Sequence, residues 1–127
     1  MPSGTPRKAS CILVVDDEED IRATVKELLE ACVEGARVRT AESGKDGLDV
    51  LRQEAGGVDL IITDYRMPGM DGMEFLRQAG QVSPNTPSFM VTAFDMDSKT
   101  TPNGSRILHK PLQPDTFVGM VEAALAA

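Results

Sequence analysis

Short apolar runs alternate along the chain with longer stretches in which apolar residues recur at helical spacing. Runs dominated by apolar residues lie at 11–15, 58–63 and 89–91, and such runs are typical of strands buried on both faces of a sheet. Between the first two runs, one face of a helix is indicated by Ile21, Val25, Leu28, Leu29 and Cys32. Strands that alternate with helices predict a parallel sheet with helices on both faces. The expected fold class is therefore α/β, doubly wound.

The other expected elements continue this alternation. Further strands are expected at 37–41 and at Ile107–Leu108. Helices are expected over 18–32, from a Ser43 cap to Gly56–Gly57, over 73–79 and over 114–126. Pro114 suits the first position of the last helix, because its missing N–H has no partner there in any case.

Length and charge limit what the chain can be. With 127 residues it can bury one core but not two, so residues 10–127 are expected to form one domain after a disordered leader over 1–9. Twenty acidic residues against 13 basic ones give a formal net charge of -7, which disfavours direct binding to nucleic acid. No apolar run approaches the ~18 residues of a membrane span, and no secretory signal begins the chain. A cytoplasmic protein without membrane contact is expected.

Polar side chains that suit metal and phosphate chemistry follow the expected strands. Asp16 and Asp17 come after the first strand, Asp64 after the third, Thr92 after the fourth and Lys110 shortly after the fifth. Carboxyl ends of parallel strands meet at one edge of a sheet, where sites form. Each residue alone has an ordinary explanation, such as a helix N-terminus for the aspartate pair. Their occurrence together at successive strand ends favours a functional site.

The chemistry of these side chains points to a divalent cation and to phosphoryl transfer. Three crowded carboxylates repel one another, and a hard cation such as Mg²⁺ or Mn²⁺ relieves that repulsion. The three negative charges of the aspartates are balanced by the two positive charges of a dication and the one of Lys110. Asp64 needs no base, because a carboxylate is already ionised near neutral pH. The hydroxyl of Thr92 can hydrogen-bond a phosphoryl oxygen, while Lys110 and the cation neutralise its charge.

Four segments, in this order, resemble the response-regulator receiver family, also called CheY-like. They are LVVDDE (13–18), DLIITDYRMPGMDG (59–72), VTA (91–93) and KPL (110–112). The resemblance runs from about Cys11 to the C-terminus, and its third-strand motif is long and specific. It implies a flavodoxin-like sheet of five strands in the order 2-1-3-4-5. It also implies a two-component phosphorelay in which Asp64 accepts a phosphoryl group from a histidine kinase or a histidine phosphotransfer protein.

The resemblance also implies a role for each site residue. The Mg²⁺ ligands would be Asp16, Asp17, Asp64 and the backbone carbonyl of Arg66. Thr92 would be the hydroxyl switch and Lys110 the cation that pairs with the phosphoryl group, with a cis peptide bond between Lys110 and Pro111. Such a domain would assist its own phosphorylation and dephosphorylation rather than act as a turnover enzyme. Its output would pass to a downstream protein that the sequence does not identify.

Two features depart from the family pattern. Ile107 stands three places before Lys110, where the family commonly has an aromatic switch residue, so coupling of Thr92 to an aromatic side chain is not implied. The stretch 94–105 is about one helical turn shorter than usual, and Pro102–Gly104 disfavours helix. A shortened or irregular fourth helix is therefore expected.

Functions of other classes fit the same residues less well. Haloacid-dehalogenase-like phosphohydrolases place a second aspartate two residues after the nucleophile, where this chain has Arg66. A flavodoxin-like FMN site needs a phosphate-binding loop after the first strand, where Asp16 and Asp17 stand. A pseudo-receiver, which would act as a protein-interaction module without phosphorylation, is the remaining alternative because the fourth-helix region is altered.

Overall fold

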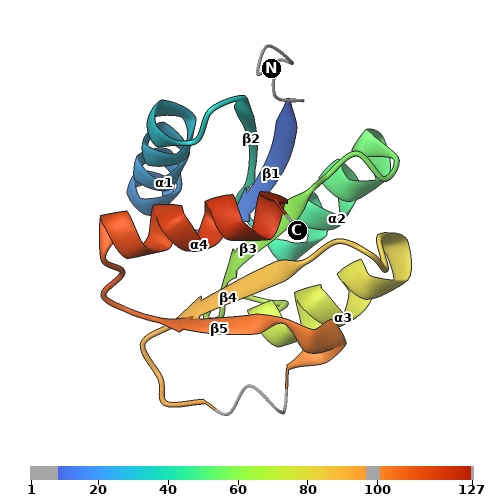
Figure 1. The fold of residues 1–127 in the computed structure, drawn as a ribbon. Helices are drawn as coiled ribbons and strands as arrows, with labels where there is room; N and C mark the ends of the chain where they lie inside the picture. Colours follow the sequence, from blue (N-terminus) through green and yellow to red (C-terminus); the bar gives the residue numbers. More distant parts are fainter. Residues whose placement is uncertain (1–8, 97–100, 127) are drawn as a thin grey trace.

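The apolar runs form one parallel sheet in a computed structural model that describes residues 9–96 and 101–126 (Figure 1). The strand order is β2-β1-β3-β4-β5, so β2 and β5 are the edges. The strands are β1 (Ser10–Val15), β2 (Ala36–Ala41), β3 (Leu60–Asp64), β4 (Ser88–Thr92) and β5 (Arg106–His109). This order confirms the flavodoxin-like α/β fold that the sequence predicts. The leader expected over residues 1–9 lies outside the described residues, apart from Ala9.

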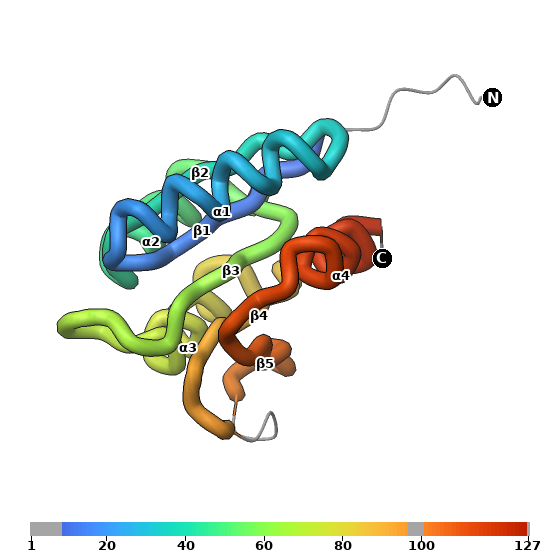
Figure 2. Tube along the Cα trace, turned by 90° about the vertical axis from the view of Figure 1, so that its left-hand side faces the viewer, coloured from blue at the N-terminus to red at the C-terminus, as the bar shows by residue number. Residues whose placement is uncertain are grey.

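Helices cover both faces of the sheet. On one face lie α1 (Glu19–Cys32) and α4 (Pro114–Ala126), and on the other lie α2 (Gly44–Glu54) and α3 (Gly72–Val82). Figure 2 shows α1 in front of β1 and β2, α4 to the right of β3 and β4, and α3 farther back. Within the described residues, no helix combines the length and the apolar character that crossing a membrane requires.

Side chains alternate between the two faces along each central strand. In β1, Leu13 and Val15 pack toward α2 and α3, whereas Ile12 and Val14 pack toward α1 and α4. All four side chains are buried. Burial on both faces explains why β1 is apolar at every position from Cys11 to Val15, without the alternation of a half-exposed strand.

Two helices begin at side-chain caps that the sequence contains. Ser43 Oγ accepts a hydrogen bond from the backbone N–H of Asp46 at 3.1 Å, as the cap expected there should. Asp71 Oδ1 accepts one from the N–H of Glu74 at 2.9 Å and starts α3. The expected range 73–79 for this helix was too short, since α3 continues to Val82.

The apolar face predicted for α1 is only partly buried. Leu29 is completely buried and Val25 and Leu28 are partly buried, but Ile21 is 42% exposed and Cys32 is also exposed. Among the described helices, α1 shares its face of the sheet with α4 alone, so neither end of the apolar stripe is covered. Ile21 and Cys32 lie on the apolar face that the sequence predicts for α1, but both are exposed rather than packed in the core.

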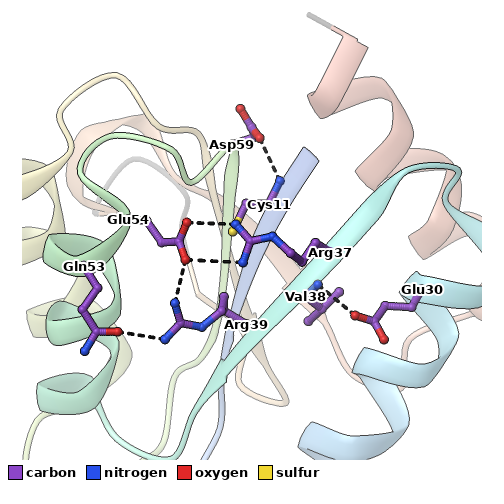
Figure 3. A network of polar contacts seen from close by, with 8 residues as sticks. All are labelled: Cys11, Glu30, Arg37, Val38, Arg39, Gln53, Glu54 and Asp59. Carbon is purple, nitrogen blue, oxygen red and sulfur yellow. Dashed lines mark hydrogen bonds and ion pairs between the residues drawn. The ribbon is translucent and has the colours of Figure 1, made fainter. Parts of the chain in front are cut away.

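A polar network ties the edge strand β2 to the helices beside it (Figure 3). Glu54, near the end of α2, accepts hydrogen bonds from Arg37 at 2.9 Å and from Arg39 at 2.6 Å, both of which extend from β2. These hydrogen bonds, that of Arg37 first, hold the pKa of Glu54 below its usual range. On the α1 side, Glu30 Oε2 accepts from the N–H of Val38 at 3.0 Å. In this network the N–H of Val38 and the charged side chains of β2 already have partners. This edge of the sheet is therefore less available to pair with another strand.

The connection between β4 and β5 has no α-helix in its described residues. It contains a short 3₁₀ helix, η3 (Pro102–Gly104), in which Asn103 has a φ of 60°. The Asn103 side chain donates a hydrogen bond to the carbonyl of Leu76 in α3 at 2.9 Å, and it fills the space that a side chain at Gly80 would occupy. This confirms the irregular fourth helix for the described part of the connection, whereas residues 97–100 lie outside it.

Candidate functional site

Three carboxylates meet where the central strands end. One oxygen from each of Asp16, Asp17 and Asp64 lies within 4.8 Å of the other two. Asp16 follows β1 directly and Asp64 is the last residue of β3, and these strands are paired in the sheet. The parallel register therefore brings together aspartates that are far apart in the sequence.

Lys110 completes this group from the far side of β4. Its Nζ lies 3.0 Å from Asp64 Oδ1, and the Asp64 side chain is only 8% exposed against 36% for that of Lys110. The N–H of Lys110 donates to the carbonyl of Thr92 at 2.8 Å, which extends the pairing of β5 with β4 by one residue. The peptide bond from Lys110 to Pro111 is cis, as the resemblance implies. Asp64 is thus a shielded carboxylate with an ammonium group beside it.

The surroundings of the Asp16 carboxylate disfavour its ionised form. Burial raises the pKa of Asp16, and the negative charges of Asp64 and Asp17 raise it further. The N–H of Glu18, which donates to Asp16 Oδ1 at 2.9 Å, and the cation of Lys110 act in the opposite direction on this pKa. The net shift of this pKa is upward, with burial as its largest cause.

The donor set fits a small divalent cation. Carboxylate oxygens are the hard ligands that Mg²⁺ and Mn²⁺ prefer, and the three oxygens are close enough to bind one ion. A bound dication would also favour the ionised form of Asp16, whose pKa is raised by burial and by the neighbouring carboxylates. The contribution expected from the backbone carbonyl of Arg66 stays a prediction.

Thr92 lies at the end of β4, and its hydroxyl oxygen has a hydrogen-bond partner. The residue is 2% exposed, and its Oγ1 accepts a hydrogen bond from the N–H of Phe94 at 2.9 Å. The hydroxyl hydrogen is a separate donor and can point toward Asp64 or a group attached to it. Ile107, expected to be an atypical switch position, is half-buried and packs against the core on the α2 and α3 side.

Phe94 contacts the two residues that follow Asp64. Its ring meets the Tyr65 ring edge-on, with centroids 6.1 Å apart, and the guanidinium carbon of Arg66 lies 4.6 Å from its centroid. Phe94 is nevertheless 45% exposed. The chain after β3 and the chain after β4 are therefore connected beside Asp64.

Sequence reasoning did not find two of these neighbours. Arg22 in α1 donates from Nη1 to the backbone carbonyl of Asp16 at 2.7 Å and so fixes the turn after β1. Tyr65 contacts the Phe94 ring. Its position directly after Asp64 was the one sequence feature that could have pointed to a place beside the site. No spacing rule predicts either contact, because each depends on the rotamer of a long side chain.

An apolar cavity of about 560 Å³ opens beside the site. It lies between α1 and the segment that leads from Lys110 into α4. Its apolar lining includes Ile21, Val25, Leu28, Leu112 and Phe117, and Lys110 lies at its border. The exposed Ile21 side chain therefore belongs to a recess that adjoins the charged group.

Comparisons with known proteins agree on one family. The family model for the response regulator receiver domain matches residues 12–122. The chain is 35% identical over 122 residues to the transcriptional regulatory protein GlrR of Escherichia coli, which covers 93% of the chain and 27% of GlrR. It is 33% identical over 119 residues to the DNA-binding transcriptional regulator NtrC of E. coli, covering 91% of the chain and 24% of NtrC. The chain thus spans about a quarter of the length of these relatives.

Solved structures give the same result. A response regulator receiver domain protein from Clostridium thermocellum matches with a TM-score of 0.83 at 30% identity, covering 92% of this chain and 94% of that one. The chemotaxis response regulator CheY4 of Vibrio cholerae matches with a TM-score of 0.79 at 31% identity, covering 93% and 100%.

Proposed function

The chain belongs to the response regulator receiver family, and on that premise we propose that it accepts a phosphoryl group on Asp64 in a Mg²⁺-dependent reaction. The observation that carries the proposal is the arrangement around Asp64, where Asp16 and Asp17 supply nearby carboxylate oxygens and Lys110 supplies a cation at 3.0 Å. Receiver domains act in two-component signalling. The phosphorylation itself, its metal and its donor belong to the proposal.

The proposed reaction moves one phosphoryl group between two nucleophiles. A carboxylate oxygen of Asp64 attacks phosphorus, the bond from phosphorus to the donor's histidine nitrogen breaks, and an acyl phosphate forms on Asp64. Lys110 then pairs with a phosphoryl oxygen, and the Thr92 hydroxyl donates to another. Mg²⁺ held by the three aspartates would neutralise charge on the transferring group. The same residues would assist hydrolysis of the acyl phosphate, so the domain resets itself.

The donor we propose is a protein, either a histidine kinase or a histidine phosphotransfer protein. Two observations support a protein partner: the apolar recess shares Lys110 with the site, and Ile21 is 42% exposed in its lining. A protein donor can bind to apolar surface at the entrance of a charged site, whereas a small phosphodonor is too small to use it. The cytoplasm, where such donors have their catalytic parts, is the proposed compartment. We propose no direct contact with nucleic acid, given the net charge of -7.

Acetyl phosphate tests the proposal without knowledge of the natural donor. Incubated with acetyl phosphate and Mg²⁺, the chain is expected to gain the mass of one phosphate, whereas Asp64→Asn, or wild type in excess EDTA, gains none. A wild type without any added mass, although folded by circular dichroism, would favour the pseudo-receiver alternative. Addition to Asp64→Asn at the wild-type level would remove Asp64 from the proposed role.

A further inference from the structure

Phe94 is 45% exposed and has three contacts near Asp64. Its backbone N–H donates to Thr92 Oγ1, its ring meets the edge of Tyr65, and the guanidinium of Arg66 lies over its face. Thr92 ends β4, while Tyr65 and Arg66 directly follow Asp64. One residue therefore links the hydroxyl beside the acceptor to the loop that begins at the acceptor.

Ile107, three residues before Lys110, cannot link Thr92 to the loop after Asp64 through an aromatic ring. Ile107 has no aromatic ring, and its side chain packs against the core cluster on the α2 and α3 side. Phe94 and Ile21 are the large hydrophobic residues that are exposed among the described residues. Of these two, Phe94 is the aromatic one, and it contacts Tyr65 and Arg66, which directly follow Asp64.

A phosphoryl group on Asp64 would compete with the Phe94 ring for the guanidinium of Arg66. An exposed contact between a guanidinium and a ring is weaker than a charge-assisted hydrogen bond to a phosphoryl oxygen. Arg66 is two residues from Asp64, and a phosphoryl group there would add negative charge close to its guanidinium. The Thr92 hydroxyl would at the same time turn its hydrogen toward a phosphoryl oxygen. Loss of Arg66 removes one contact of the Phe94 ring, whereas Thr92 Oγ1 can still accept from the Phe94 N–H.

We propose that Phe94 is a positioning residue that couples Thr92 to the loop after β3, and that phosphorylation of Asp64 draws Arg66 off its ring. The ring then separates from Tyr65, and the surface beside the site changes shape. This inference rests on the proposed function and deepens it, because it names the side chain that transmits the phosphorylated state. The residues whose contacts with the Phe94 ring change on phosphorylation are Arg66 and Tyr65.

Tyr65 gives the coupling a direct optical signal. It is the only tyrosine of the chain, and the chain has no tryptophan, so emission excited in the tyrosine band comes from this residue. Adding beryllium fluoride with Mg²⁺, a stable mimic of the phosphoryl group, is expected to change the Tyr65 emission of wild type. Phe94→Leu keeps an apolar side chain at an exposed position but removes the ring. It is expected to lose most of that change.

Two further measurements separate this inference from the proposed function. The mass gained from acetyl phosphate must be the same in wild type and Phe94→Leu, so that a lost optical signal is not a lost reaction. Ile107→Val is the matched control, and it is expected to keep the wild-type emission change.

The possible outcomes are distinct. An emission change of wild-type size in Phe94→Leu overturns the coupling and leaves the proposed function intact. Loss of the change in Ile107→Val assigns the signal to position 107 and also overturns the coupling. No phosphate on wild type overturns the proposed function, and the coupling with it.

Discussion

Lys110 Nζ lies 3.0 Å from Asp64 Oδ1, although Asp64 ends β3, Lys110 follows β5, and β4 lies between these two strands in the sheet. The contact therefore passes across the end of β4, where Thr92 lies. It joins a residue from the last third of the chain to the proposed acceptor. The ammonium group is already in place where negative charge would develop during phosphoryl transfer, so it needs little reorganisation.

Replacing Lys110 with methionine tests this role. The variant keeps an unbranched chain but loses the charge, so phosphorylation by acetyl phosphate is expected to slow by about 10²-fold or more. Lys26→Met is the matched control, because Lys26 is an exposed residue of α1 outside the site. The rate of mass gain with Mg²⁺ is the measurement. Equal rates for Lys110→Met and wild type would exclude Lys110 from the reaction.

The raised pKa of Asp16 predicts the effect of removing its charge. A folded pKa above the unfolded value of about 3.9 means that ionised Asp16 lowers the stability of the metal-free protein at neutral pH, and that this penalty disappears as the pH falls below that value. Asp16→Asn is therefore expected to raise Tm in EDTA at pH 7 and to leave it unchanged at strongly acid pH. It should also reduce the rise in Tm that Mg²⁺ gives wild type.

The control for this experiment removes a charge elsewhere. Asp20 is exposed in the first turn of α1 and is not one of the three clustered carboxylates. Asp20→Asn should give no gain in Tm in EDTA and should keep the full response to Mg²⁺. If Asp16→Asn responds to Mg²⁺ as strongly as wild type, the ion binds elsewhere or not at all.

Ile21→Ser separates docking of a protein donor from the chemistry at Asp64. Because Ile21 lines the apolar recess beside Lys110, the serine variant is expected to accept phosphate from its protein donor several-fold more slowly. The rate with acetyl phosphate should be unchanged, since that donor needs no recess. Cys32→Ser changes an exposed residue at the other end of α1 and should match wild type with both donors. A slow reaction of Ile21→Ser with acetyl phosphate would instead indicate damage to the site.

The network on β2 predicts a pH-dependent part of the stability. Since Arg37 and Arg39 lower the pKa of Glu54, its contribution is complete above the unfolded pKa of about 4.3 and is lost as the pH falls through the lower folded value. Glu54→Gln should therefore lower Tm at pH 7, and the difference from wild type should shrink on acidification. Asp49→Asn affects only an exposed pair with Arg52 and should change Tm little.

Regular features of this fold could be predicted from the sequence. Continuous apolar runs such as Cys11–Val15 marked strands buried on both faces, and the rule for parallel sheets predicted that Asp16, Asp64 and Lys110 would meet. The strand order came from the resemblance to receivers, because periodicity does not determine which strands are neighbours. Pro102–Gly104 correctly predicted the irregular segment before β5.

What the sequence did not reveal depends on tertiary packing and rotamers. Helical spacing placed Ile21 on the apolar face of its helix, but spacing alone does not tell how far neighbouring elements extend over that face, and Ile21 is exposed. The contact of Arg66 with Phe94 joins residues far apart in the sequence and follows from the directions of two side chains. For the same reason the donation from Arg22 to the carbonyl of Asp16 was not anticipated.

Locating the phosphoryl group tests the central claim most directly. Borohydride reduces an acyl phosphate on aspartate to homoserine, so wild type treated first with acetyl phosphate and Mg²⁺, then with borohydride, can be digested and its peptides sequenced by mass spectrometry. Homoserine is predicted at position 64, and none is predicted when EDTA replaces Mg²⁺. Homoserine at Asp16 or Asp17 with an unmodified Asp64, or modification that is independent of the metal, would contradict the claim.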